Sequence, residues 1–223
     1  MRSLNTRCRD IEAQLPLAPV DWLKCQQYHI APQVMQAMTE AWSFGIGKDA
    51  RHESWIRQHN PLVNIQCFDP TTLSMHTIAQ AGAGLQWAPI AYHPTETECV
   101  FYTTDDARRC YSLIKPTHTA VVHEHTVECA DIYTLLDRYA KPNYIKFDVE
   151  GMWYELVCDV LRTGVRPYQL VGEFEMYYGN ADQQFDRLHT VIKATQEEGY
   201  TVFVNRLLHA EMLELAFVRG DMW

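Results

Sequence analysis

The sequence of 223 residues lacks a C-x-x-C pair, although it contains seven cysteines. An odd number of cysteines without that spacing argues against a zinc knuckle and against a disulfide framework. Reduced, mostly buried thiols are expected instead, as in proteins of the cytosol. Residues 1–10 lack the apolar stretch of a secretory signal peptide, and no apolar run approaches the length of a membrane span. We therefore expect a cytoplasmic protein without a membrane partner.

Positive charge is also scarce. The chain has 19 Lys and Arg residues against 28 Asp and Glu residues, a formal net charge of −9. An acidic surface repels a phosphate backbone, so we expect no nucleic-acid partner. Hydrophobic residues make up 47% of the chain and charged residues 21%, which is ordinary for a globular protein with a buried core. The length favours one domain, residues 32–223, after an N-terminal extension, residues 1–31.

The chain has no internal repeat or low-complexity tract. Residues up to about Tyr28 are expected to be irregular, and Pro32 is well suited to begin a helix that ends near Glu40. Strands and helices then alternate. The expected strands are Ala41–Phe44, Val63–Phe68, Leu85–Ala91, Tyr144–Phe147 and Tyr168–Phe174. The expected helices are Asp49–His59, Thr71–Gln80, Asp131–Tyr139, Gly151–Leu161 and Ala181–Glu198.

Two further regions complete the predicted fold. Extra strands are expected in an insertion covering about residues 94–128. Near the end of the chain, Tyr200–Asn205 and Glu214–Val218 can pair as an antiparallel hairpin. Alternation of strands and helices is typical of a sheet covered on both faces. The sequence therefore predicts an α/β, Rossmann-like fold with a mostly parallel seven-stranded sheet and a C-terminal antiparallel hairpin strand.

Ligands of such sheets bind outside the carboxyl ends of the strands, so residues just after strands are the most informative. Gly45-Ile46-Gly47 follows the first expected strand, where glycine lets the backbone turn tightly and approach a ligand. Asp69 follows the second strand, where an acid can accept hydrogen bonds from ribose hydroxyls. A plain strand-to-helix turn and a helix-capping aspartate are the simpler readings of the two features.

A third feature is the run Tyr144–Gly151, which places Asp148 and Glu150 after the fourth expected strand. An I-K-x-D-V-E-G run in this place resembles the signature of the FkbM-type methyltransferases. Further segments resemble that family's other motifs in the same order: Trp42–Asp49, Asn64–Pro70, Gln169–Phe174 and Glu198–Phe203. The resemblance covers roughly residues 42–219.

The resemblance implies a class I methyltransferase domain that binds S-adenosylmethionine and methylates a hydroxyl of a sugar or another small metabolite. It places Gly45 and Gly47 at the methionine part of the cofactor, Asp69 at the ribose, and Asp148 near the sulfonium. The expected cofactor-binding residues are Phe44, Gly45, Gly47, Asp49, Asp69, Pro70, Ala91 and Asp148. One position departs from the family, because Trp153 stands where a second acid is common. That departure points to a different substrate or to a degenerate site.

Methyl transfer requires an acceptor that is aligned with the methyl group and a base that removes its proton. Asp148 and Glu150 are candidate bases, and His93, just after the third expected strand, is another. Either acid could instead hold a divalent cation, with Glu173 and Glu175 as further ligands. A cation is the less favoured reading, and no metal ligand is assigned.

Two histidines, His123 and His125, share one face of an expected strand, because alternate residues of a strand point the same way. Such a pair is more typical of a solvated strand face than of a metal site.

Two other functions stay open. Gly45, Gly47 and Ala50 also satisfy the looser G-x-G-x-x-A pattern of dinucleotide sites, which would suit an NAD(P)-dependent oxidoreductase. Near the fourth strand, however, the chain offers Tyr144-Ile145-Lys146 and not the Tyr-x-x-x-Lys of a short-chain dehydrogenase. The alternative to both enzymes is a catalytically inactive cofactor-binding module, which Trp153 would suit. We expect the acceptor to be a small molecule that is selected by the N-terminal segment and by residues 94–118.

Overall fold

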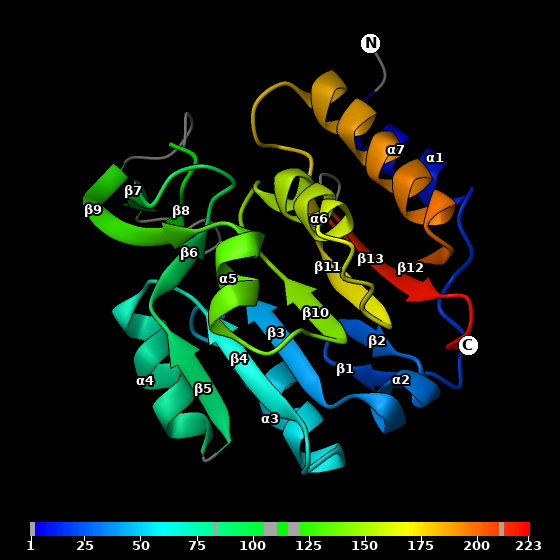
Figure 1. Cartoon of the computed structure of the whole chain (residues 1–223). Coiled ribbons are helices and arrows are strands. Elements are labelled where there is room, and N and C mark those ends of the chain that lie inside the picture. Colours follow the sequence, from blue (N-terminus) through cyan, green and yellow to red (C-terminus); the bar gives the residue numbers. More distant parts are fainter. Residues whose placement is uncertain (1–2, 83, 105–110, 116–120, 210–211) are drawn as a thin grey trace.

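A seven-stranded sheet forms the middle of the molecule in the computed structural model, which describes residues 3–82, 84–104, 111–115, 121–209 and 212–223. The strands lie in the order β12-β13-β11-β10-β3-β4-β5 (Figure 1). Their bounds are β3 Glu40–Phe44, β4 Asn64–Phe68, β5 Leu85–Ala88, β10 Tyr144–Phe147, β11 Gln169–Glu175, β12 Tyr200–His209 and β13 Met212–Arg219. β13 runs antiparallel to β11 and β12, whereas the other neighbouring pairs of this sheet are parallel. The predicted Rossmann-like fold is thus confirmed, including the C-terminal hairpin.

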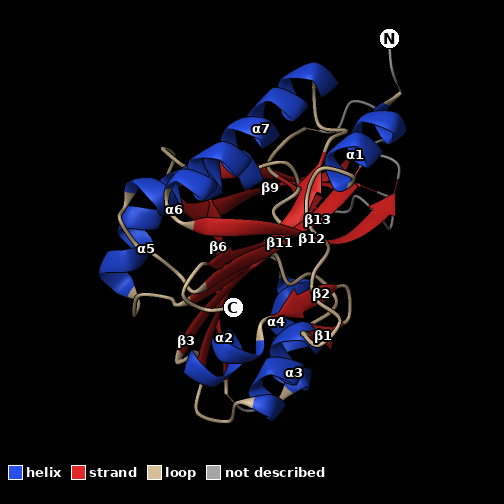
Figure 2. Ribbon diagram, turned by 90° about the vertical axis from the view of Figure 1, so that its right-hand side faces the viewer, coloured by secondary structure: helices blue, strands red, loops and turns tan. Residues whose placement is uncertain are grey.

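Helices cover both faces of this sheet (Figure 2). One face carries α1 Leu4–Glu12, α5 Ile132–Arg138, α6 Trp153–Arg162 and α7 Ala181–Glu197, and the other carries α2 Pro32–Ala37, α3 Arg51–His59 and α4 Thr72–Ala81. Trp42 and Phe147 point into the first layer, whereas Ala41 and Tyr144 point into the second. Alternate side chains of a strand face opposite ways, and both faces are covered, so β10, β11 and all of β3 after Glu40 are buried. None of the described helices is both long and apolar enough to cross a membrane.

The strand order reverses between β3 and β10. From β3 the chain builds outward through β4 and β5 and then returns to β10 on the other side of β3. Phe44 and Phe147 are paired in register, so the two strands end side by side. The backbone N–H of Asp148 donates to the carbonyl of Phe44 over 3.1 Å. In open α/β sheets this reversal point is where ligands bind.

The third expected strand, Leu85–Ala91, is wrong as a single strand. β5 ends at Ala88, and after Pro89 a separate strand, β6 Ile90–Tyr92, leaves the main sheet. Proline has no N–H to give to a strand ladder, which explains the break. β6 pairs in parallel with β9 Val121–Ala130 in a second sheet, which also contains β7 Glu98–Thr104 and β8 Tyr111–Ser112.

The N-terminal segment is more ordered than expected. Besides α1 it contains a short hairpin of β1 Leu23–Cys25 and β2 Tyr28–Ile30. α1 contacts β12, and β2 contacts β11 and β13. Strands of three residues are too short to give a periodic pattern, so the sequence could not reveal them. The remaining predicted elements are found within a few residues of their predicted ends. The division of the chain at residue 32 stays a prediction.

Candidate functional site

A cavity of about 320 Å³ opens at the point where the strand order reverses. Its walls are the turn after β3, the ends of β4 and β10, and residues of the second sheet, including Phe101. The structure brings together in this lining all the residues that were expected to bind a cofactor: Phe44, Gly45, Gly47, Asp49, Asp69, Pro70, Ala91 and Asp148. Glu150, one of the expected bases, also lines the cavity. Their roles stay predictions, whereas their common location is a finding.

The turn after β3 depends on glycine for two different reasons. Gly45 has φ +70°, and a Cβ atom on it would lie 1.7 Å from the carbonyl oxygen of Asp148. Only glycine therefore allows this turn to pass so close to the end of β10. Gly47 has φ +55°, but a Cβ atom there would meet nothing within 4 Å. Its requirement is for backbone conformation alone.

Asp69 holds this turn from the neighbouring strand. One carboxylate oxygen accepts the N–H groups of Ile46 and Gly47 over 2.9 and 2.8 Å. The other accepts the N–H and the hydroxyl of Thr71 over 2.8 and 2.6 Å. The N-cap of α4 is Thr71 itself, which accepts the N–H of Ser74, so Asp69 supports the helix start indirectly. The N–H groups of Ile46 and Gly47 in the glycine turn are thus already bound by a carboxylate of the chain itself.

Acidic groups dominate the cavity. Asp49 is bound by Arg51, whose hydrogen bond lowers the pKa of this carboxyl to about 2, so Asp49 is ionised at neutral pH. Burial raises the pKa of Asp148, although Lys146 opposes that shift. Burial disfavours the charged form of Lys146, but the carboxylates of Asp148 and Glu53 hold its pKa above the ordinary value. Lys146 therefore stays an ammonium, and it donates to the carbonyl of Gly45 over 2.6 Å.

Glu150 occupies an unusual backbone position beside these acids. Its φ is +48°, in a region that favours glycine. Two contacts fix it there: Tyr178 donates its hydroxyl to the Glu150 carboxylate over 2.6 Å, and Ser112 of the second sheet donates to the Glu150 carbonyl over 3.1 Å. Strained backbone of this kind concentrates at functional sites and needs such support. The second sheet is thereby tied to the loop after β10.

A cluster of three acids lies next to the cavity. Asp148, Glu173 and Glu175 each place a carboxylate oxygen within 4.8 Å of the others. Burial raises the pKa of Glu173 to about 7, with a further rise from Asp148. Burial also raises the pKa of Glu175, with Glu150 the next cause. The sequence had indicated Glu173 and Glu175 only as optional cation ligands, and the structure places them with Asp148.

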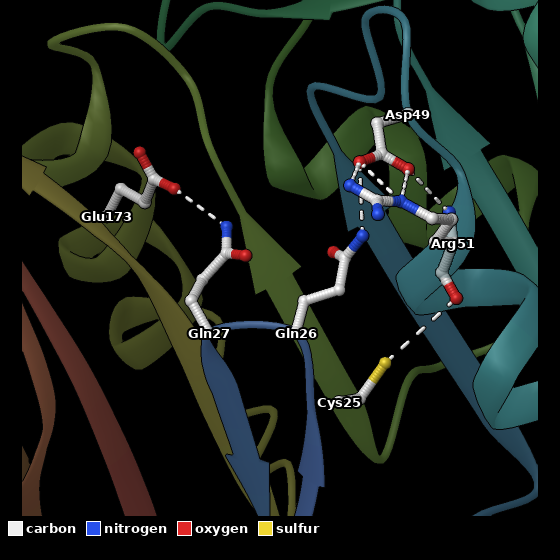
Figure 3. Close-up of polar contacts among 6 residues, drawn as sticks. All are labelled: Cys25, Gln26, Gln27, Asp49, Arg51 and Glu173. Carbon is white, nitrogen blue, oxygen red and sulfur yellow. Dashed lines mark hydrogen bonds and ion pairs between the residues drawn. The ribbon is translucent and has the colours of Figure 1, made fainter.

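The N-terminal hairpin reaches over this end of the sheet (Figure 3). The Gln26 amide donates to Asp49 over 3.1 Å, and the Gln27 amide donates to Glu173 over 3.1 Å. Tyr28 adds a hydroxyl bond to Glu173 over 3.3 Å. Sequence reasoning missed these glutamines, since Gln27 and Glu173 lie 146 positions apart in the chain. No local signal marked them beyond the aromatic Tyr28.

Three residues singled out from the sequence lie elsewhere. The Nδ1 atom of His93 accepts the N–H groups of Thr95 and Glu96 in the turn after β6, and His93 is not among the cavity-lining residues. His123 and His125 lie on an exposed stretch of β9, as the simpler reading expected.

Trp153, at the position where the family commonly has an acid, is fully buried. Its ring lies 4.9 Å from that of Phe174 in the hydrophobic core. It therefore does not obstruct the cavity, whose lining does not include it.

His52 is buried behind the site and provides a pH-dependence prediction. Its Nε2 lies 2.9 Å from the Tyr144 hydroxyl, and burial lowers its pKa from 6.5 to about 3. In the unfolded chain this histidine binds a proton as the pH falls below 6.5, while in the folded protein it stays neutral. We expect His52 to lower the free energy of unfolding as the pH falls from 6.5 towards about 3, whereas the raised pKa of Glu173, about 7, acts in the opposite direction. As the pH falls, His52→Gln should therefore lose less stability than wild type, or gain more. Urea unfolding at several pH values measures it.

The matched control is His59→Gln, at an exposed histidine of the same helix. This variant should keep the wild-type slope. An unchanged slope in His52→Gln would contradict the assignment of the buried neutral histidine.

Comparisons with known proteins leave the family open. No family model matches the sequence, and no curated protein matches it significantly. Similar solved structures include precorrin-6y C5,15-methyltransferase from Geobacter metallireducens GS-15, which is 11% identical with a TM-score of 0.47, over 93% of this chain and 95% of that chain. A proposed O-methyltransferase from Klebsiella pneumoniae is 9% identical with a TM-score of 0.49, over 98% of this chain and 91% of that chain.

A third similar structure is the plantazolicin methyltransferase BpumL in complex with S-adenosylhomocysteine (SAH). It is 8% identical with a TM-score of 0.44, over 84% of this chain and 80% of that chain. These neighbours are methyltransferases, but such low identities and TM-scores assign neither a family nor an activity to this chain. The FkbM resemblance stays a prediction.

Proposed function

We propose that the chain is an S-adenosylmethionine-dependent methyltransferase that methylates a hydroxyl of a small molecule. The observation that carries this proposal is the carboxylate of Asp69 on the N–H groups of Ile46 and Gly47. In dinucleotide sites the N–H groups of the glycine turn and the following helix start face a pyrophosphate. A pyrophosphate here would meet a buried carboxylate, so an NAD(P) oxidoreductase fits poorly.

The charge of the cavity supports a cationic ligand. Its lining contains four acids, Asp49, Asp69, Asp148 and Glu150, and one basic residue, Lys48. S-adenosylmethionine carries a sulfonium, an ammonium and a carboxylate group, so its net charge is positive, and it bears no phosphate. Opposite charges across a binding site favour the matching ligand and discriminate against anions. The same lining disfavours acceptors with phosphate groups, in agreement with a small uncharged metabolite as the acceptor.

For Asp69 to bind a ribose hydroxyl, one of its present hydrogen-bond donors must leave. A carboxylate has about four lone-pair sites, and four donors already occupy those of Asp69. The Thr71 hydroxyl is the donor that can rotate away most easily, because it is a side-chain group. A ribose hydroxyl can then take its place without disturbing the glycine turn.

The chain's own groups can accept the proton that methyl transfer releases. When bound, S-adenosylmethionine supplies a methyl group that is already activated on sulfur. Asp148 and Glu150 line the cavity, and each can accept the proton of an acceptor hydroxyl. Burial raises the pKa of Asp148, which makes it a stronger base than an ordinary carboxylate. Tyr92 and Phe101 from the second sheet line the opposite wall and reduce the access of water.

The test is isothermal calorimetry of the purified chain against SAH, with NAD and NADP measured in parallel. We expect one SAH per chain and no heat of binding from either dinucleotide. Binding of NAD or NADP without SAH would overturn the proposal. Binding of SAH without turnover of any hydroxyl acceptor would favour the inactive cofactor-binding module.

A further inference from the structure

The three-acid cluster has the spacing of a cation site. Phe147 and Gly172 are paired in register, so Asp148 at the end of β10 lies beside Glu173 of β11. Glu173 and Glu175 share a face of β11, because they are two positions apart. One oxygen from each acid lies within 4.8 Å of the others. Oxygen ligands of Mg²⁺ or Ca²⁺ bind at roughly 2.0–2.6 Å, so ligands on opposite sides of the ion are about 4–5 Å apart.

A buried oxygen without a partner provides independent support. Glu175 is 1% exposed, and its Oε2 accepts the N–H of Gly151 over 3.2 Å. Its Oε1 is buried and has no hydrogen-bond partner within the part of the chain that the structure describes. Burying such an oxygen without compensation costs free energy. The hydrogen bonds of Glu173 from Gln27 and Tyr28 both go to Oε1, and Figure 3 shows its second oxygen pointing away from Gln27.

Carboxyl groups in this region outnumber the ammonium group that faces them. Lys146 is the ammonium whose field acts on Asp148 and Glu173, and Glu53 and Asp69 act on the same ammonium. Its hydrogen bonds go to the carbonyls of Gly45 and Phe44. Ionised together, the three acids would carry more negative charge than this one ammonium balances. Carboxylates at this spacing repel one another unless a cation or shared protons lie between them.

We propose that Asp148, Glu173 and Glu175 bind a divalent cation of the oxygen-preferring class, such as Mg²⁺, Mn²⁺ or Ca²⁺. The ligands are all carboxylates, which suits these hard ions and not zinc or copper. Asp148 lines the cavity, so the ion lies at its wall.

In the proposed methyltransferase the ion would activate the acceptor hydroxyl, a role that rests on the proposed function. The bound cation would lower the pKa of an acceptor hydroxyl beside it. Glu150, which also lines the cavity, would accept the proton of that hydroxyl. Asp148 in this arrangement is a ligand, and the proton acceptor is Glu150.

The experiment titrates EDTA-treated, dialysed protein with Mn²⁺ and follows the free ion by electron paramagnetic resonance. We expect one Mn²⁺ per chain, displaced by excess Mg²⁺. Glu175→Gln should weaken binding at least about tenfold, because changing even the outer-shell partner of a metal ligand typically costs about 10–100-fold in affinity. The matched control is Glu155→Gln. This glutamate also has one buried oxygen with no partner among the described residues, but it pairs with Arg187 outside the cluster. It should bind Mn²⁺ as wild type does.

The outcomes separate the two proposals. If the wild-type protein leaves all Mn²⁺ free, or if Glu175→Gln and Glu173→Gln both bind as tightly as wild type, the cation site is wrong. Circular dichroism checks that each variant is folded, and Glu173→Gln carries the test if Glu175→Gln is not. SAH binding without Mn²⁺ binding would remove the cation and keep the proposed function. Mn²⁺ binding without SAH binding would keep the cation site and remove the proposed function.

Discussion

Gly45→Ala is expected to prevent the chain from folding stably. The added Cβ would lie 1.7 Å from the carbonyl oxygen and 2.8 Å from the carbonyl carbon of Asp148, and the residue would keep φ +70°. Backbone atoms cannot move aside as a flexible side chain can, so β3 and β10 would have to separate at the centre of the sheet. We expect a loss of more than about 4 kcal/mol in the free energy of unfolding, a large part of the stability of a typical domain. Urea unfolding followed by circular dichroism measures it.

Gly47→Ala is the control for this prediction. Gly47 has a similar φ of +55°, but the added Cβ would meet nothing within 4 Å. Only the cost of the left-handed conformation remains, about 1–2 kcal/mol. Equal losses in the two variants would mean that backbone conformation, and not the close approach to Asp148, decides the need for Gly45.

Asp69→Ala is expected to have the second largest effect, on both stability and cofactor binding. The change removes all four hydrogen bonds to this carboxylate and leaves the buried N–H of Ile46 without its acceptor. Bonds to a charged group contribute roughly 1.5–3 kcal/mol each but do not add, so we expect about 3–5 kcal/mol of destabilisation. SAH affinity should fall at least about a hundredfold, since the glycine turn and the ribose contact are lost together. Urea unfolding and calorimetry measure the two effects.

Two further variants make the result interpretable. Asp131→Ala removes another helix-start aspartate, which accepts the N–H of Thr134 over 2.7 Å far from the glycine turn. It should cost about 1 kcal/mol and leave SAH affinity unchanged. Asp69→Asn keeps the shape of the side chain and serves if the alanine variant is unfolded. A folded Asp69 variant with wild-type SAH affinity would contradict the assigned role.

The parts of the site that follow strands could be predicted from sequence. The positions of Gly45, Asp69 and Asp148 were evident because each lies where a short apolar run gives way to a turn, which is a local pattern. The topology then brings them together, since parallel strands that are neighbours in the sheet end on the same edge. The fold class alone therefore predicts that these three residues lie close together.

Other features depend on contacts that no local pattern encodes. That Asp69 binds the N–H groups of the glycine turn follows from the packing of two strand ends and not from the identity of the residues. The contact of Gln27 with Glu173 joins distant parts of the chain. Pro89 is a local signal that was available, and it should have divided the segment Leu85–Ala91. The burial of Trp153 results from the packing of α6 on the sheet, where its ring lies against Phe174 of β11.

The strands of the second sheet are consecutive in the sequence, from β6 after Pro89 to β9 before Asp131. It supplies one wall of the cavity, while the glycine turn, Asp69 and Asp148 belong to the main sheet. One wall of the cavity is therefore encoded by a single stretch of the chain, separate from the stretches that encode the opposite wall. A protein engineer could transplant a different segment between these two junctions and redesign one wall, while the strands that hold the opposite wall keep their sequence.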